Sequence, residues 1–246
     1  MATLIPSKSR APSGLFVALA QTPLERQLAQ ELHKDVYIRK GLLREGTVKP
    51  PVLPQASAPG SAIFVAKERD AIVGTITFYM DSVIGLPMDD IHRHEVDDMR
   101  GRFTRVAEIG ALAVRADRRG CGIPIMLFLA AYRWAVKANV RCIVACVNPA
   151  YRRVYSKLLL FKVLGECKQH FRFLAAPSIP IGLDLTTARR LYREEAYCSS
   201  SHDRLQKLFL REGYAPYIQP TLLGQAPSAI REEASKSISS WPESFY

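Results

Sequence analysis

The sequence predicts an α/β fold, in which a central mixed and twisted β-sheet is flanked by helices and followed by a C-terminal helical appendage. Residues 108–165 read as a strand, an arginine- and glycine-rich turn, an apolar helix, a second strand and a short helix. Residues 61–66 and 71–79 are apolar runs joined by a tight polar turn, which predicts a hairpin. With 246 residues and 48% hydrophobic composition, the chain can bury a substantial core.

The N-terminal part begins with a polar stretch, 1–13, which we expect to be a flexible lead-in to a domain covering residues 14–185. Residues 14–20 predict the first strand. The sequence Thr22-Pro23-Leu24-Glu25 combines a capping box with proline at the first helical position, so a helix begins there, and Gly41 can end it. Helical spacing predicts an apolar stripe on this helix at Leu24, Leu28, Leu32 and Val36.

Two long connections interrupt the pattern. Residues 46–60 are rich in proline and predict a loop. The connection after residue 79 is also long, and we expect a short helix at 91–99 and consider a role as a substrate lid. His92 and His94 lie in this polar stretch without a nearby cysteine or third histidine, which favours a solvated loop over a metal site; no metal is expected.

The second half of the chain supplies the rest of the sheet and its cover. Residues 123–138 are apolar almost all round, which predicts a helix that is covered on several sides. Beyond residue 185 the composition changes, and the appendage, 186–246, contains weakly amphipathic segments. The further elements are predicted as a strand buried on both faces at 140–147, a helix at 150–159, a last strand at 180–185, and appendage helices at 187–195 and 201–211.

The formal net charge of +11 favours anionic partners: nucleic acid, an anionic membrane surface or an acidic protein. A basic surface can equally serve solubility alone. The sequence has no interleaving of aromatic and basic residues and no helix-turn-helix pattern, so nucleic acid is not the expected partner.

The five cysteines form no CxxC pair, and Cys142 and Cys146 fall on one face of a predicted strand, which indicates buried thiols in a reducing compartment. The apolar run at 15–20 is too short for the core of a signal peptide, and no run approaches a membrane span. We therefore expect a cytoplasmic protein.

The turn between the strand at 108–114 and the helix at 123–138 has the chemistry of an anion site. Backbone N–H groups at a helix N-terminus point outward, glycine admits a phosphate close to the backbone, and Arg118 and Arg119 add charge. Such turns also occur without a ligand.

These residues resemble the phosphate loop of the Gcn5-related N-acetyltransferase (GNAT) superfamily, Arg/Gln-x-x-Gly-x-Gly/Ala. Arg119, Gly122 and Pro124 fall on its three fixed positions. Pro124 departs from the pattern and removes one N–H donor to phosphate. That loss suits the single phosphodiester of an acyl carrier protein better than the pyrophosphate of coenzyme A, although proline is also favoured in a first helical turn.

The wider chain, about residues 15–185, resembles the long-chain N-acyl amino acid synthases, relatives of the acyl-homoserine lactone synthases. The stretches that carry the likeness are DVYIRKGLL, FVAKERDAIVGTITFYMDS, GLPMDDI, AEIGALAV and VNPAYRRVYSKLLLF. The resemblance implies a GNAT acyltransferase fold and transfer of a fatty acyl group from acyl carrier protein to the amine of an amino acid. The implied donor is acyl-phosphopantetheine on the carrier protein, or alternatively acyl-CoA; a hydrophobic product would imply peripheral proximity to a membrane.

Two other functions stay open at this point. One is an acetyl-CoA-dependent N-acetyltransferase that acts on a small amine or a protein. The other, from a different class, is a non-catalytic basic binding module.

The resemblance implies catalytic roles for Glu108, as the base that deprotonates the amine, and Tyr155, as the acid that protonates the leaving thiolate. Glu108 could instead be a surface residue at a strand end, and Tyr155 could merely pack. The strands at 108–114 and 140–147 should splay apart, so that an acyl-pantetheine arm can bond to free backbone groups between them. A free strand N–H could then stabilise the oxyanion.

Three further groups of residues are candidates for binding. Asn148 could bond to the pantetheine amide or cap a helix, and the basic residues of the helix at 150–159 could meet the carrier protein or form a solvated face. A substrate carboxylate needs a cation. The candidates are Val114, Arg118, Arg119, Gly120, Gly122 and Asn148 for the cofactor, Arg102, Arg105 and Arg115 for the substrate, and Arg152, Arg153 and Lys157 for the carrier protein.

Overall fold

A computed structural model describes residues 14–48, 53–119 and 121–194. The expected lead-in, the expected helix at 201–211 and most of the expected appendage lie outside these residues, as does Gly120. None of the helices in the described part is long and apolar enough to cross a membrane.

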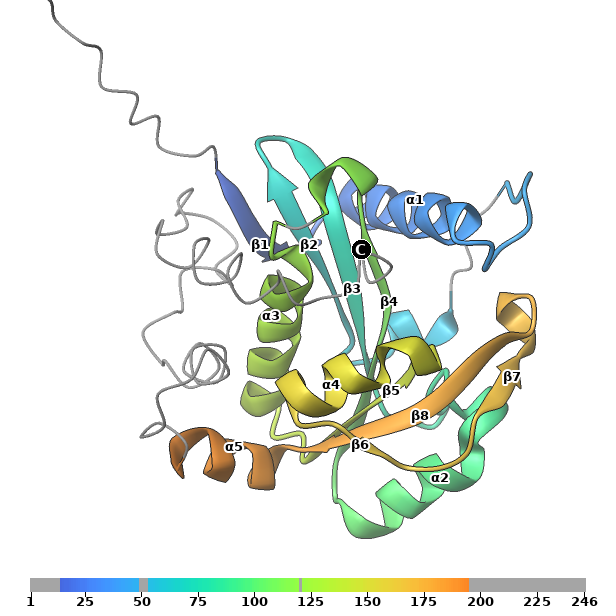
Figure 1. Ribbon diagram of the computed structural model, residues 1–246. Helices are drawn as coiled ribbons and strands as arrows, with labels where there is room; N and C mark the ends of the chain where they lie inside the picture. The colour runs from blue at the N-terminus through green and yellow to red at the C-terminus, as the bar shows by residue number, and fades with distance from the viewer. Residues whose placement is uncertain (1–13, 49–52, 120, 195–246) are drawn as a thin grey trace, which may run out of the picture.

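An eight-stranded mixed sheet forms the centre of the molecule, which confirms the predicted fold class (Figure 1). The strands follow the order β1-β2-β3-β4-β5-β8-β6, and β7 pairs with β8. Only β4 and β5 run parallel to each other; the other pairs within these described residues are antiparallel. The strands are β1 (Leu15–Leu19), β2 (Ala62–Glu68), β3 (Ala71–Met80), β4 (Val106–Val114), β5 (Cys142–Val147), β6 (Lys162–Val163), β7 (Lys168–His170) and β8 (Ala176–Asp184).

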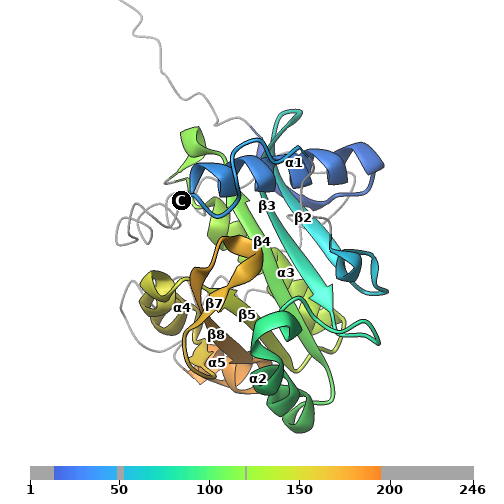
Figure 2. The same ribbon diagram turned by 90° about the vertical axis from the view of Figure 1, so that its right-hand side faces the viewer.

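Helices cover both faces of this sheet, with α1 and α2 on one face and α3 on the other (Figures 1 and 2). The α-helices are α1 (Pro23–Arg39), α2 (Asp89–Arg102), α3 (Ile123–Lys137), α4 (Arg152–Leu159) and α5 (Leu185–Glu194). Short 3-10 helices are η1 (Pro54–Ser57), η2 (Ala116–Arg118), η3 (Pro149–Tyr151) and η4 (Phe171–Phe173).

β5 is buried on both faces, as predicted. Ile143 and Ala145 belong to the large apolar core that includes α3, whereas Cys142 and Val144 belong to a second core beneath α2. Because side chains alternate along a strand, two separate cores mean that both faces of β5 are covered.

The capping box of α1 is present as predicted: the Glu25 N–H donates to Thr22 Oγ1 at 3.1 Å, and the Glu25 carboxylate accepts from the Thr22 N–H at 3.2 Å. The predicted apolar stripe is wrong in its first half, because Leu24 is 62% exposed. The helix instead packs against the sheet through Ala29, His33 and Val36. A small residue at 29 allows the helix to approach the sheet closely.

α2 corrects the interpretation of His92. The residue lies inside this helix and is completely buried, rather than in a solvated loop. Its spacing to Val96 and Met99 places all three on one helix face, and the two apolar residues pack in the core beneath α2. β6, β7 and the early start of β8 at Ala176 were not predicted from the sequence, since such short or polar strands carry little periodicity.

Candidate active site

β4 and β5 pair over only three residues and then separate, as the sequence predicts. The paired residues are Val106 with Cys142, Ala107 with Ile143 and Glu108 with Val144. Both strands continue beyond this point, to Val114 and Val147. We call the point of separation the β4–β5 fork.

A bulge bends β4 just beyond the fork. Between the pairs Thr77–Gly110 and Thr75–Ala113, β3 has one residue and β4 has two. Ala111 accommodates the extra residue with a φ of 51°. Bulges of this kind interrupt a ladder and turn part of a strand toward a neighbouring space, here the cavity described next.

A cavity of about 480 Å³ opens at the fork. β4 lines it from Glu108 to Val114, and β5 lines it with Ala145, Cys146 and Val147. Further walls come from α1, from β3, from the start of α3, from η3 and α4, from the β7–β8 hairpin, which contains η4, and from the loop residues Leu42, Leu53 and Pro87. Segments that are far apart in sequence therefore line the cavity between the two strands.

Glu108 lies at the fork itself and faces the cavity, with 5% of its surface exposed. Its Oε2 accepts a hydrogen bond of 2.8 Å from the Met88 N–H. Burial raises the pKa of this carboxyl to about 8; the charges of Asp89 and Asp90 act in the same direction, and Met88 and Arg172 act against them. A carboxyl that titrates near neutral pH can accept a proton and release it again.

Tyr155 also lines the cavity and is buried. Its ring packs edge-on against Phe128 and Phe161, at centroid distances of 5.4 and 5.6 Å. Burial raises the pKa of its phenol well above the usual value, so the residue stays protonated at neutral pH. Tyr155 therefore both packs against its aromatic neighbours and lines the cavity.

The phosphate-loop residues separate into two groups. Arg119 and Pro124 line the cavity, and Gly122 caps the N-terminus of α3 with a φ of 75°, in the left-handed region that favours glycine. Arg118 does not line it: its guanidinium pairs with Glu68 at 2.7 Å and with Asp117 at 3.1 Å.

Asn148 and Val114 both line the cavity. The Asn148 Oδ1 also accepts a hydrogen bond of 3.0 Å from the Ala150 N–H and caps η3. Asn148 therefore caps a helix, which was one of its two predicted uses, and it also lines the cavity.

The other predicted cations lie elsewhere. Arg102 stacks 5.6 Å from the ring of Phe103, Arg105 donates to the Ala138 carbonyl at 2.8 Å, and Arg115 pairs with Asp117 at 2.6 Å. None of these three arginines lines the cavity. The basic residues of α4 are exposed at its surface, namely Arg152, Arg153 and Lys157.

Sequence reasoning missed several cavity residues. Arg172 comes from η4 and forms an ion pair with Asp90, and Lys40 comes from the end of α1. Burial lowers the pKa of Lys40, and the charge of Arg119 lowers it further, which indicates that these two cations lie close together. No local pattern in the sequence marks either residue as part of a site.

A chain of aromatic rings joins α1 to η4 across the cavity wall. His33 packs against Tyr37 at 4.0 Å, Tyr37 against Phe173 at 5.2 Å, and Phe173 against His170 at 4.3 Å. Burial lowers the pKa of both histidines to about 4, so both rings are neutral at physiological pH. This part of the wall is therefore aromatic and uncharged.

Within the described ranges, no cluster of three or more His, Cys, Asp or Glu side chains is arranged to hold a metal ion. Cys121, Cys142, Cys146 and Cys167 are free thiols. Cys146 lines the cavity, and burial raises the pKa of its thiol, which makes it a poor nucleophile at neutral pH.

A family model described as N-acyl amino acid synthase FeeM matches residues 28–184. The chain is similar to the solved structure of FeeM, an N-acyl amino acid synthase from uncultured soil microbes, with 22% identity, a TM-score of 0.65, and coverage of 73% of this chain and 95% of that one. It is also similar to BjaI, a CoA-dependent acyl-homoserine lactone synthase solved with SAM and isopentyl-CoA, with 15% identity, a TM-score of 0.56, and coverage of 89% and 99%.

A protein from Lactobacillus plantarum, assigned as an N-acetyltransferase, has 16% identity, a TM-score of 0.51, and coverage of 70% of this chain and 99% of its own. No curated protein sequence matches the chain. At these identities the solved structures establish the fold, which is that of the GNAT acyltransferases.

Proposed function

The chain belongs to the FeeM family of N-acyl amino acid synthases, and on this premise we propose that it transfers a fatty acyl group from acyl carrier protein to the amine of an amino acid. The observation that carries the proposal is the placement of Glu108. A buried carboxyl with a pKa of about 8 faces a cavity at the point where two parallel strands separate.

The reaction needs a base because an amino acid amine is mostly protonated at neutral pH. The ionised fraction of Glu108 takes a proton from the ammonium group, the free amine attacks the thioester carbonyl, and the C–S bond of the tetrahedral intermediate breaks. The nitrogen then gives up its second proton, which is balanced by protonation of the departing thiolate. The products are an amide, a thiol and one proton released to solvent. Among the described residues, the bonded partner of Glu108 is the Met88 N–H and not a cation, so its carboxylate is also a natural partner for the incoming ammonium group.

The fork can hold the donor. Beyond Glu108 the facing edges of β4 and β5 are no longer paired, so an acyl-pantetheine arm can lie between them like an added strand. A backbone N–H of the bulged segment can then donate to the thioester oxygen, an effect worth about 3 kcal/mol in acyl transfer. Tyr155, which stays protonated, can donate to the leaving thiolate.

The cavity has cations at two separate places, which fits two anionic substrates. Lys40 and Arg119 lie together near the N-terminus of α3, where helix geometry favours the phosphodiester of phosphopantetheine. The charge of Arg172 instead acts on Glu108. We therefore assign the carboxylate of the acceptor to Arg172, because its amine must lie against Glu108.

The proposed carrier-protein surface is the exposed basic face of α4, next to the cavity. Its residues, Arg152, Arg153 and Lys157, stand at the surface and could meet an acidic carrier protein.

The direct test incubates the protein with acylated carrier protein and a mixture of the twenty amino acids, and detects N-acyl products by mass spectrometry. A parallel reaction supplies the same acyl group as acyl-CoA. We expect N-acyl amino acid from the carrier-protein donor at a higher rate than from acyl-CoA. A third reaction supplies acetyl-CoA. Consumption of acetyl-CoA with no N-acyl amino acid from either long-chain donor would contradict the proposal and favour the N-acetyltransferase alternative.

A further inference from the structure

We propose that Arg100 is a positioning residue that holds the Met88 N–H against Glu108, through Asp89 and the loop between β3 and α2. This inference rests on the proposed role of Glu108 as the base. Arg100 does not line the cavity and touches none of the reacting atoms. It acts through the backbone that it fixes in place.

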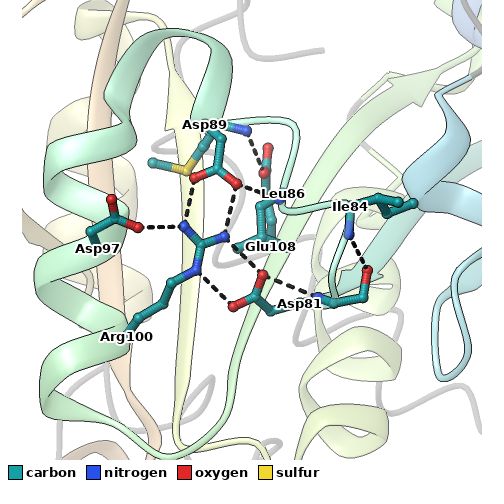
Figure 3. A network of polar contacts seen from close by, with 9 residues as sticks. Asp81, Ile84, Leu86, Asp89, Asp97, Arg100 and Glu108 are labelled. Carbon is teal, nitrogen blue, oxygen red and sulfur yellow. Dashed lines mark hydrogen bonds and ion pairs between the residues drawn. The ribbon is translucent and has the colours of Figure 1, made fainter.

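The guanidinium of Arg100 binds carboxylates from three places in the chain (Figure 3). Its Nε and Nη2 donate to Asp81, at the end of β3, at 2.8 Å each. Its Nη1 and Nη2 donate to Asp89, at the start of α2, at 2.7 and 2.8 Å. Its Nη1 also donates to Asp97, one turn earlier on α2, at 2.7 Å. Both ends of the intervening loop are thus bound to one planar, fork-shaped group.

Asp89 transmits this arrangement to the loop. Its Oδ2 accepts a hydrogen bond of 2.7 Å from the Leu86 N–H in addition to the bond from Arg100. Burial disfavours the Asp89 carboxylate, but the bonds from Arg100 and Leu86 outweigh that cost and lower its pKa, so the carboxylate is charged at neutral pH. Leu86 is two residues before Met88, whose N–H reaches the base.

Gly85 shows how closely the loop fits this carboxylate. Its φ is +72°, and a Cβ at this position would lie 2.3 Å from Asp89 Oδ2. Any side chain at position 85 must therefore displace Asp89 or the loop. The loop conformation, the Asp89 carboxylate and Arg100 form one assembly.

This assembly fixes the loop that carries Met88, whose N–H donates a 2.8 Å hydrogen bond to Glu108 Oε2. The bond stabilises the charged form of Glu108, whereas burial favours the neutral form. It also fixes the position of one carboxyl oxygen, Oε2, of a residue that lines the cavity, which orients the base. Other titratable or charged groups that act on or near Glu108 are Tyr79 on β3, Cys146 on β5, Asp89 and Asp90 on α2, and Arg172 on η4.

The sharpest test is Gly85→Ala, which displaces Asp89 without removing a charge. Its matched control is Gly101→Ala, next to Arg100 on α2, where an added Cβ meets nothing within 4 Å. We expect the acid limb of the pH profile of kcat/KM to move up by about 0.5 to 1 pH unit in Gly85→Ala, because the base loses a donor to its charged form. The control should keep the limb of the unmodified protein.

Arg100→Lys is the second variant, because it keeps the positive charge and removes the fork geometry. It should move the limb in the same direction, and its kcat/KM should recover to within about threefold of the unmodified value at pH values above the limb. An unmoved limb, a shift to lower pH, or no recovery at high pH would each overturn the positioning role.

Glu108→Gln separates this inference from the proposed function. If Glu108→Gln loses turnover while Gly85→Ala and Arg100→Lys keep the original limb, only the positioning role fails. If Glu108→Gln keeps full turnover, the role of Glu108 as the base fails, and the positioning role fails with it.

Discussion

Glu95 on α2 and Glu108 on β4 are buried to nearly the same extent, 8% and 5% exposed, yet their chemistry is opposite. Glu95 is bonded to the Lys168 ammonium at 2.8 and 3.0 Å; burial disfavours its charge, but Lys168 outweighs burial and lowers its pKa. Glu108 has a backbone N–H as its bonded partner, and burial raises its pKa to about 8. Burial by itself therefore does not mark a reactive carboxyl; burial without a bonded cation does.

The two glutamates also differ in the space around them. Glu95 lies directly against Gly165, where an added Cβ would be 2.6 Å from its Oε1, and it does not line the cavity. Glu108 faces a cavity of about 480 Å³. Glu95 links α2 to β7, and Glu108 has room beside it for a reacting amine.

The strongest test of this contrast is substitution of each glutamate by glutamine. Glu108→Gln should lower kcat/KM about 10²- to 10⁴-fold, since the amine loses its base. Glu95→Gln should keep kcat within a fewfold and lower the free energy of unfolding by about 1 kcal/mol, because the ion pair with partly exposed Lys168 is lost. Steady-state kinetics and denaturant unfolding of both variants decide the matter. Equal losses of turnover would break the contrast.

The pH dependence of stability should also differ in sign between the two sites. Between about pH 4.5 and 8 the unfolded state ionises Glu108 and the native state keeps it protonated, so this residue reduces stability as the pH rises, by on the order of a few kcal/mol. The lowered pKa of Glu95 contributes stability above its unfolded value, near 4.5, and that contribution is lost as the pH falls through its folded value.

Urea unfolding across this pH range measures both effects. Relative to the unmodified protein, the free energy of unfolding of Glu108→Gln should increase from pH 5 to pH 8. The free energy of unfolding of Glu95→Gln should be lower than that of the unmodified protein near neutral pH, and this difference should disappear as the pH falls below about 4.5. A parallel pH dependence in the two variants would show that the two carboxyls do not differ as described.

The role of Arg172 can be tested through substrate binding. Arg172→Gln should raise KM for the amino acid about 10- to 100-fold with a smaller effect on the donor, because a charge-assisted hydrogen bond to the carboxylate is removed. Arg102→Gln is the matched control, since Arg102 does not line the cavity. A KM that changes equally in both variants, or only for the donor, would remove Arg172 from this position.

The smallest effect is expected at Tyr155. A thiol has a pKa near 8.5, so the thiolate leaves readily even without an acid. Tyr155→Phe preserves the edge-on packing with Phe128 and Phe161 and should lower kcat about tenfold or less. A loss as large as that of Glu108→Gln, measured in a variant of unchanged thermal stability, would make proton donation to the thiolate a dominant step.

Local patterns in the sequence were sufficient to predict an α/β fold and most of its elements, whereas Glu108 was predicted as the candidate base from the family resemblance. Capping boxes, apolar periodicity and β-branched runs act over a few residues, so α1, α3 and the β2–β3 hairpin could be recognised directly. The same reasoning misplaced His92, because a polar neighbourhood in sequence says nothing about which face of α2 packs on the sheet.

Only the tertiary structure decided which charges reach the cavity. Arg102, Arg105 and Arg115 are close to Glu108 along the chain but lie outside the cavity lining, whereas Lys40 and Arg172 reach it from α1 and η4. The opposite protonation of Glu95 and Glu108 has the same origin. A carboxyl's pKa depends on burial and on partners such as Lys168 and Met88, which the fold brings from distant positions and which no local pattern can reveal.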